Sequence, residues 1–166
     1  MAWGLAGYGG VGKKGRKSDT TDTRRYRWVM VDNLSPEDRS RLMSRVRGKD
    51  TKPEMIVRRL AHRLGYRFRL HRRDLPGSPD IVFPGRKKVI FVHGCYWHRH
   101  GCKRTTTPKS NTQFWQKKFD DNVMRDQKNL DDLANRGWDA MVVWQCQAEK
   151  PDGLADRLTD FLGDRS

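Results

Sequence analysis

The fold is decided by residues 80–92, which read DIVFPGRKKVIFV. Two short apolar runs, 80–83 and 89–92, flank the turn-forming sequence Pro84-Gly85-Arg86-Lys87. Both runs are rich in β-branched and aromatic residues, and they lack the polar alternation of a strand with one wet face. The segment therefore predicts a hairpin within a sheet that is covered on both faces.

Helical and strand patterns extend outward from this hairpin. The sequence Thr51-Lys52-Pro53-Glu54 is a capping box, and the apolar spacing after it predicts a helix that ends at Gly65. A shorter basic helix is predicted before it, from Ser35 to Gly48. The remaining predicted elements are a half-buried strand at 66–70, a long helix at 112–135, a buried strand at 138–145 and a final helix at 151–162. The order predicts an α/β fold, with a mixed central sheet flanked by helices.

Composition limits the possible partners and the number of domains. The chain has 166 residues, enough for one domain, with a basic and Gly-rich arm over 1–34 and a folded domain over 35–166. The formal net charge of +15 indicates a polyanionic partner, nucleic acid first and a membrane surface second. No apolar run is long enough to span a bilayer, and residues 1–11 lack the features of a signal peptide, so we expect an intracellular protein.

Residues 92–102, which read VHGCYWHRHGC, concentrate metal-binding side chains. Three cysteines cannot all pair within one chain, and intracellular thiols stay reduced, so metal ligation explains them better than disulfides do. One complete set for structural zinc is Cys95, His100, Cys102 and Cys146. The spacing is not that of a zinc finger, Cys146 alone is equally typical of a small buried residue, and His98 can substitute for His100.

A second candidate site lies where the hairpin strands begin and end. Asp80 follows Pro79 at the start of one strand, and the next strand ends at His93. A carboxylate in this place is typical of nucleases that hold Mg²⁺ against a scissile phosphate. The usual nuclease pattern would put an acid at Phe91 and a lysine at His93, and this chain has neither. The structural alternatives are that Asp80 serves the turn and that His93 is a satisfied core residue.

Several motifs together resemble one family. They are Leu75-Pro76-Gly77-Ser78-Pro79-Asp80, Phe91-Val92-His93-Gly94-Cys95-Tyr96-Trp97-His98-Arg99-His100-Gly101-Cys102, Phe114-Trp115, Asn122-Val123-Met124-Arg125-Asp126 and Val143-Trp144-Gln145-Cys146. From about residue 40 to residue 162 the chain resembles the Vsr-type very-short-patch repair endonucleases, which are strand-specific T:G mismatch nickases. The resemblance implies a restriction-endonuclease-like fold, and it does not cover the arm.

The resemblance also implies roles for single residues. Asp80 would be a Mg²⁺ ligand, His93 and His98 would act at the cleaved phosphate, and Glu54 would orient one of these histidines. Cys95, His100, Cys102 and Cys146 would hold a structural zinc. Val92 stands where the family has a threonine, so only its backbone carbonyl could serve the Mg²⁺ site. Arg99 and Gly101 replace histidines that are not needed as ligands. Without the resemblance, Glu54 fits an ordinary capping box.

Aromatic and basic residues complete the expected DNA-binding surface. Tyr96 and Trp97 lie between the zinc ligands, and with Trp115 they could form a rigid platform that wedges beside a mispair. The plain alternative is that Trp97 and Trp115 belong to the core. We also expect DNA contacts from Met43, Arg45, Arg47, Lys49 and Asn122.

The expected function is Mg²⁺-dependent nicking of duplex DNA next to a T:G mismatch left by deamination of 5-methylcytosine. The alternatives are a restriction-type nuclease without a mismatch requirement and a non-catalytic zinc module that binds DNA. The resemblance implies, as functional partners, a cytosine-C5 methyltransferase, mismatch-repair proteins and DNA polymerase. We expect a monomer in the cytoplasm, associated with the nucleoid.

The basic arm generates a prediction about affinity. Deleting residues 1–31 removes seven basic and two acidic residues, a net loss of five positive charges. Binding to duplex DNA should weaken, and its dependence on salt should become shallower, because fewer counterions are released from the phosphates. Titrations of both proteins at several salt concentrations measure this effect. An unchanged slope would show that the arm does not touch DNA.

Overall fold

The computed structural model describes residues 35, 37, 38, 41, 44, 45, 48–150 and 153–163, all within one compact unit. The elements are α2 (Lys52–Arg63), β1 (Arg69–Leu70), β2 (Ile81–Phe83), η3 (Pro84–Arg86), β3 (Lys88–His93), α3 (Thr112–Asn135), β4 (Asp139–Trp144), α4 (Gln145–Ala148) and α5 (Leu154–Leu162). The predicted arm over 1–34 lies outside the described residues.

The centre of the unit is a mixed four-stranded sheet with the order β1-β2-β3-β4. The first three strands are antiparallel, and β4 lies parallel to β3 along six residue pairs, from Lys88 with Asp139 to His93 with Trp144. The predicted hairpin is therefore confirmed, with the 3-10 turn η3 between its strands.

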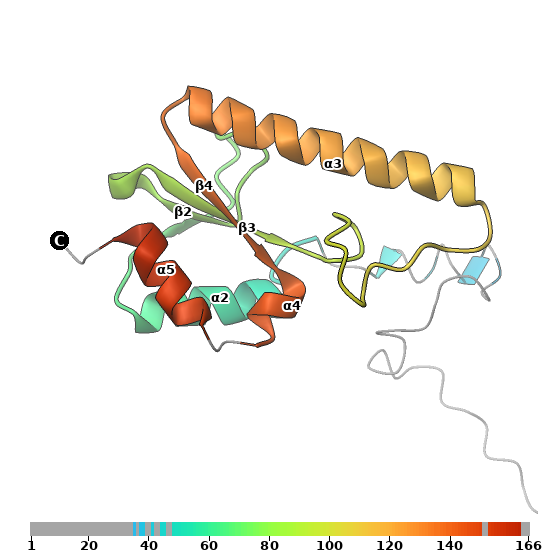
Figure 1. The fold of residues 1–166 in the computed structure, drawn as a ribbon. Helices are drawn as coiled ribbons and strands as arrows, with labels where there is room; N and C mark the ends of the chain where they lie inside the picture. Colours follow the sequence, from blue (N-terminus) through green and yellow to red (C-terminus); the bar gives the residue numbers. More distant parts are fainter. Residues whose placement is uncertain are drawn as a thin grey trace, which may run out of the picture. The chain divides into compact units, whose positions relative to one another are not determined.

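Helices cover both faces of the sheet, as the unbroken apolar strands predicted (Figure 1). On one face, Ile81, Phe83 and Ile90 pack with residues of α2, α4 and α5. On the other face, Val82, Val89 and Phe91 pack against Leu133 of α3. Full burial of one such side chain stabilises the fold by roughly 1.5–3 kcal/mol. These two layers hold most of the buried apolar side chains of the described residues, so they contribute most of this stabilisation.

The helices begin and end at the predicted signals. Thr51 and Glu54 form the capping box of α2. The long helix α3 has the predicted bounds, and the chain turns away from it at Gly137, whose φ of +70° favours glycine. The last helix begins at Leu154, later than predicted, because Gly153 before it is in the left-handed conformation with φ +77°. Pro151 and Asp152 lie outside the described residues. None of the described helices is long and apolar enough to cross a membrane.

The predicted strand at 66–70 is wrong in most of its length, since only Arg69 and Leu70 pair with β2. The backbone N–H of Tyr66 donates to the Ala61 carbonyl at 3.0 Å, so this residue still closes the end of α2. Its ring packs edge-on against Phe83, and its hydroxyl donates to the Gly163 carbonyl. The alternating side chains therefore reflect core packing by an irregular segment rather than strand pairing.

The predicted helix at 35–48 is described only in part. The N–H of Asp38 donates to Oγ of Ser35 at 3.1 Å, which agrees with the predicted cap. Glu37, Asp38, Arg41 and Ser44 are helical. Two expected DNA-binding residues of this region, Met43 and Arg47, lie outside the described residues.

Candidate active site and metal centre

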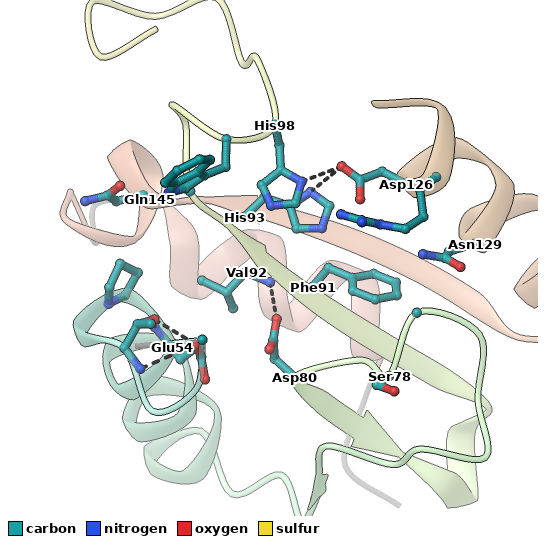
Figure 2. A pocket seen from close by; sticks show the side chains of 17 residues that line it. Glu54, Ser78, Asp80, Phe91, Val92, His93, His98, Asp126, Asn129 and Gln145 are labelled. Carbon is teal, nitrogen blue, oxygen red and sulfur yellow. Dashed lines mark hydrogen bonds and ion pairs between the residues drawn. The ribbon is translucent and has the colours of Figure 1, made fainter. Parts of the chain in front are cut away.

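A cavity of about 510 Å³ lies where β3 ends and β2 begins. Its wall includes Glu54, Asp80, Val92, His93 and His98, so residues far apart in the sequence meet there (Figure 2). The remaining lining residues include Trp97 and Gln145, together with Arg125, Asp126 and Asn129 of α3. All the predicted catalytic residues thus line one cavity.

Asp80 is held at the floor of this cavity by the sheet itself. Its Oδ2 accepts a hydrogen bond of 2.7 Å from the backbone N–H of Val92 on the neighbouring strand. Burial raises the pKa of Asp80 to about 6, while the Val92 N–H opposes the rise and the negative charge of Glu54 adds to it. A bound cation would relieve this unfavourable charge, so the position suits a metal ligand.

The two histidines lie face to face across the cavity from Asp80. The rings of His93 and His98 are stacked, with centroids 3.9 Å apart and planes 10° apart. Nδ1 of His98 contacts Oδ2 of Asp126, and Nδ1 of His93 lies 4.0 Å from the same oxygen. Burial and the neighbouring His98 lower the pKa of His93 to about 4, so at neutral pH His93 is uncharged and can accept a proton.

Glu54 lines the cavity, but its hydrogen bonds stay within the first turns of α2. Its carboxylate accepts from Thr51, from the Asp50 N–H at 3.0 Å and from Nη2 of Arg58 at 2.7 Å. Among the described residues its nearest histidine partner is His71, with Nε2 and Oε2 4.0 Å apart. The side chain that contacts these two histidines is instead Asp126, which shares a hydrogen bond with His98 and lies 4.0 Å from His93.

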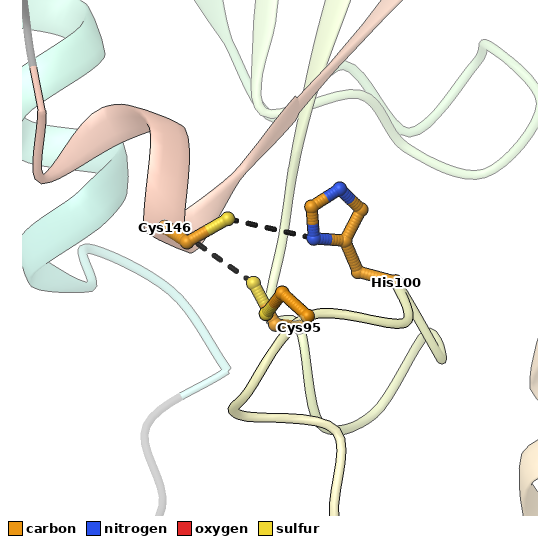
Figure 3. Close-up of side chains that lie close together, drawn as sticks. Cys95, His100 and Cys146 are labelled. Carbon is orange, nitrogen blue, oxygen red and sulfur yellow. Dashed lines mark hydrogen bonds between the residues drawn. The ribbon is translucent and has the colours of Figure 1, made fainter.

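The predicted zinc ligands converge beside this cavity. One atom each of Cys95, His100, Cys102 and Cys146 lies within 4.8 Å of the others, close enough for one ion to bind all four. Sγ of Cys146 lies 3.4 Å from Nδ1 of His100, and the Cys146 N–H donates to Sγ of Cys95 (Figure 3). His100 stacks on Trp144 at 4.4 Å, which fixes the plane of its ring.

The electrostatics of this cluster fit a bound cation. Burial and the adjacent sulfurs raise the pKa of Cys95 to about 12. Burial also disfavours the Cys102 thiolate, yet the Arg104 backbone N–H and hydrogen bonds from His100 and the other two sulfurs lower the Cys102 pKa to about 6. Three thiolates so close together repel one another unless a metal ion neutralises them, and three thiolates with one imidazole are a donor set that zinc prefers.

The three expected DNA-contacting aromatics pack together but differ in exposure. Trp97 is half-buried and lines the cavity, and its ring lies edge-on to Tyr96 with centroids 5.0 Å apart. Trp115 is only 5 % exposed and stacks on Phe119 of the same helix. In this arrangement Trp97 can contact a ligand in the cavity, whereas Trp115 is buried and packs against the Trp97 ring.

The other expected DNA-binding residues occupy varied positions. Asn122 is nearly buried, donates to the Trp97 carbonyl at 3.1 Å and accepts from Arg125 at 2.9 Å. It therefore anchors the loop that carries Trp97. Arg45 and Lys49 are exposed, as a contact with phosphates requires.

Three functional candidates were not singled out from the sequence. Asp126 lies on the α3 stripe that includes Trp115, Phe119 and Asn122, and an acid on such an inward stripe was the available signal. Arg58 and His71 contact each other behind Glu54 and Asp80. No local sequence pattern marks Arg58 and His71, because their contact depends on how α2 lies relative to the segment that follows β1.

The turn before Asp80 is fitted against α3. Gly77 has φ +70°, and a Cβ added there would lie 2.8 Å from Nδ2 of Asn129. Only glycine fits this contact, since any side chain would push Asn129 away. The loop that leads into Asp80 is thereby fixed to the helix that supplies Asp126.

Comparisons with known proteins find relatives that match most of the chain. Residues 31–104 match the family described as DNA mismatch endonuclease Vsr. The chain is 53 % identical over 133 residues to the type II nicking enzyme V.XorIIP of Xanthomonas oryzae pv. oryzae, covering 80 % of this chain and 98 % of that protein. It is 39 % identical over 133 residues to the type II nicking enzyme V.NmeAIP of Neisseria meningitidis, covering 80 % and 95 %. With the DNA mismatch endonuclease Vsr of Escherichia coli it shares 36 % over 134 residues, covering 80 % and 86 %.

Relatives that nick DNA match most of the chain, and the molecule is an endonuclease that hydrolyses phosphodiester bonds. The chain belongs to the Vsr family of DNA mismatch endonucleases.

The raised pKa of Asp80 predicts a pH-dependent cost in stability. Between about pH 4 and pH 6 the folded state binds the Asp80 proton more tightly than the unfolded state, so this group destabilises the fold increasingly as pH rises. Asp80→Asn keeps an acceptor for the Val92 N–H and removes the charge. Without added Mg²⁺ the variant should be more stable than the wild type at pH 7.5, by on the order of 1–3 kcal/mol.

Urea unfolding of both proteins at several pH values measures this difference. The advantage of the variant should shrink as pH falls from 6 toward 4, where the wild-type carboxyl becomes protonated in both states. A constant difference across this range would show that the Asp80 charge is not unfavourable in the folded protein.

Proposed function

We propose that the protein is a Mg²⁺-dependent, zinc-stabilised endonuclease that nicks one strand of duplex DNA next to a T:G mismatch. The observation that carries the proposal is the single cavity in which Asp80 faces the stacked pair of His93 and His98. A carboxylate for a cation and two imidazoles for proton transfer are the groups that phosphodiester hydrolysis needs. The family's name and the mixed four-stranded sheet flanked by helices support it.

Asp80 and the Val92 carbonyl are the proposed ligands of Mg²⁺, which would stabilise charge on the phosphate and activate water when bound. The Val92 N–H keeps Oδ2 of Asp80 in place, so Asp80 is positioned before the cation arrives. Glu54 contributes a negative charge beside Asp80. We assign it this role because its hydrogen bonds go to Arg58 and the start of α2.

The histidines would move protons at the cleaved phosphate. His93 is neutral and can accept a proton from the attacking water. His98 donates from Nδ1 to Asp126, so in its doubly protonated form it could give a proton from Nε2 to the leaving oxygen, with the Asp126 carboxylate stabilising the positive charge. Loss of that oxygen from the phosphorus would leave a 5′ phosphate on the product. Such a nick is a substrate for a DNA polymerase with a 5′ exonuclease.

Selection of the mismatch is assigned to Trp97. A mispaired step costs less to unstack than a paired one, so an inserted ring favours a T:G site through the deformability of the duplex. Trp97 lines the cavity, and Asn122 and Tyr96 hold its loop. An inserted Trp97 ring would therefore lie next to the groups proposed to cleave the phosphodiester bond.

The rival function is a type II nuclease that nicks matched DNA. Two relatives are named type II nicking enzymes, and this name supports the rival function.

A cytosine-C5 methyltransferase and mismatch-repair proteins are proposed as functional partners on the resemblance alone, since a methyltransferase makes the base whose deamination creates the mismatch.

One assay separates these functions. The wild type should nick a T:G duplex in Mg²⁺, should nick the matched duplexes far more slowly, and should leave both intact in a metal chelator. Trp97→Ala should keep its melting temperature and lose the preference for T:G, because the ring is half-buried and faces the cavity. Trp115→Ala is the matched control, and its burial predicts a loss of about 3–5 kcal/mol in stability.

Asp80→Ala completes the assay as the chemical control. It should abolish nicking while leaving binding to the T:G duplex largely intact. Equal nicking of T:G and matched DNA by the wild type would favour the rival function. A large drop in the melting temperature of Trp97→Ala with unchanged discrimination would place that ring in the core.

The proposed zinc predicts a coupling between metal content and folding. We expect about one zinc per chain, and Cys102→Ser or Cys146→Ser should lose both the metal and several degrees of melting temperature, because ligand binding is part of the folding free energy. His62→Ala, at an exposed histidine of α2, should retain both. Metal analysis and thermal melts measure this, and a zinc-free wild type with normal melting would overturn the zinc proposal.

A further inference from the structure

Behind the floor of the cavity, the guanidinium of Arg58 lies at the centre of a polar cluster. Its Nη1 lies 2.5 Å from Oδ1 of Asp50, and its Nη2 lies 2.7 Å from Oε2 of Glu54 and 2.9 Å from Nε2 of His71. The Arg58 side chain is only 7 % exposed and that of Glu54 only 4 %. A buried charge pair of this kind costs stability unless its geometry is well satisfied, so its presence needs a reason.

The cluster is not a second metal site in this arrangement. Single atoms of Asp50, Glu54 and His71 lie within 4.8 Å of one another, as the ligands of one ion would. However, the guanidinium already contacts all three of these side chains. Arg58 is therefore the cation that these groups share.

This contact determines which nitrogen of His71 carries hydrogen. Arginine can only donate hydrogen bonds, so Nε2 of His71 must accept from Arg58. A neutral imidazole that accepts at Nε2 carries its hydrogen at Nδ1. Nδ1 lies 3.9 Å from Oδ1 of Asp80, which is too long for a hydrogen bond but leaves the N–H dipole facing the carboxylate.

The two oxygens of Asp80 thus have different neighbours. Oδ2 accepts a hydrogen bond from the Val92 N–H, and Oδ1 faces His71. His71 has φ +47°, a conformation that histidine adopts more readily than most residues with a side chain. This backbone conformation and the contact with Arg58 together fix the ring beside Asp80.

We propose that Arg58 and His71 are positioning residues that hold Asp80 in the orientation needed to bind the catalytic cation. Arg58 fixes the tautomer of His71, and the Nδ1–H of His71 then orders the Asp80 carboxylate from behind the cavity. Arg58 also binds the Glu54 carboxylate, which therefore does not contact His93 or His98. The inference rests on the proposed role of Asp80 as a Mg²⁺ ligand. Arg58 and His71 act through Asp80, and neither is assigned a contact with DNA or with the reacting atoms.

Three substitutions at His71 separate the two contacts of its ring. His71→Gly removes the ring without adding strain at positive φ. His71→Asn restores an N–H close to the position of Nδ1 and tolerates the same backbone conformation, so it retains the donor toward Asp80. His71→Gln can reach Arg58 at the position of Nε2 but offers no donor toward Asp80. His62→Ala is the matched control, because His62 is an exposed histidine on α2.

The measurement is the rate of nicking of a T:G duplex as a function of Mg²⁺ concentration. His71→Gly and His71→Gln should need about 10-fold more Mg²⁺ for half the maximal rate, as for other residues that support a metal ligand. Their rates at saturating Mg²⁺, zinc content and DNA affinity should stay near those of the wild type. His71→Asn and His62→Ala should follow the wild-type titration.

A spectroscopic readout tests the tautomer independently of activity. Nitrogen-15 NMR of the histidine rings should show His71 protonated at Nδ1 in the wild type. The double variant Arg58→Met/Glu54→Gln removes both partners of the buried ion pair, so no lone charge remains, and it should lose this preference for Nδ1.

The outcomes distinguish this inference from the proposed function. A wild type that does not nick T:G DNA in Mg²⁺ would overturn the proposed function, while the NMR result would still decide the tautomer. A wild type that nicks normally, with the same Mg²⁺ titration in His71→Gly and His71→Gln, would overturn the inference alone. Wild-type His71 protonated at Nε2 would also overturn it.

Discussion

The parallel pairing of β3 with β4 is the constraint on which the rest of the structure depends. The register places His93 opposite Trp144 at the last pair of the ladder. Cys95 and Cys146 each lie two residues beyond this pair, so the two strands deliver one thiol each to the same point. His93, the proposed catalytic residue, and the cysteine cluster are therefore positioned by the same ladder of backbone hydrogen bonds.

The site holds several ionisable groups out of water. Burial raises the pKa of Asp80 and lowers that of His93, and Glu54 is buried with its charge balanced by Arg58. Withdrawing such groups from water costs stability, and perturbed pKa values of this kind are concentrated at functional sites. Burial of apolar side chains on both faces of the sheet offsets this cost.

Much of the fold could be predicted because its signals are local. The capping box of α2, the turn between β2 and β3, and the ends of α3 each depend on a few neighbouring residues. The strand predicted at 66–70 failed because the alternation of Tyr66 and Phe68 fits an irregular segment that packs on Phe83 equally well. The alternation of apolar and polar residues indicates which side chains are buried. It does not indicate whether the backbone pairs with a neighbouring strand.

The candidate site was predictable only where one element carries several of its parts. Asp80 directly precedes β2 and His93 ends β3, so both stand next to recognisable strands. Cys95 and Cys102 are close together in the sequence, and Cys146 follows β4. Asp126 comes from a helix of 24 residues on which many positions are acidic, and Arg58 with His71 depends on long-range packing. For Glu54 the capping box is confirmed, and its predicted contact with a catalytic histidine stays a prediction.

The tight contact between Gly77 and Asn129 has a mechanical consequence. Because the turn that precedes Asp80 rests on α3, and α3 also carries Asp126, a displacement of this helix would carry the cation side and the imidazole side of the cavity in the same direction. The distance between the two sides is therefore less sensitive to the position of the helix than it would be if only one side rested on it.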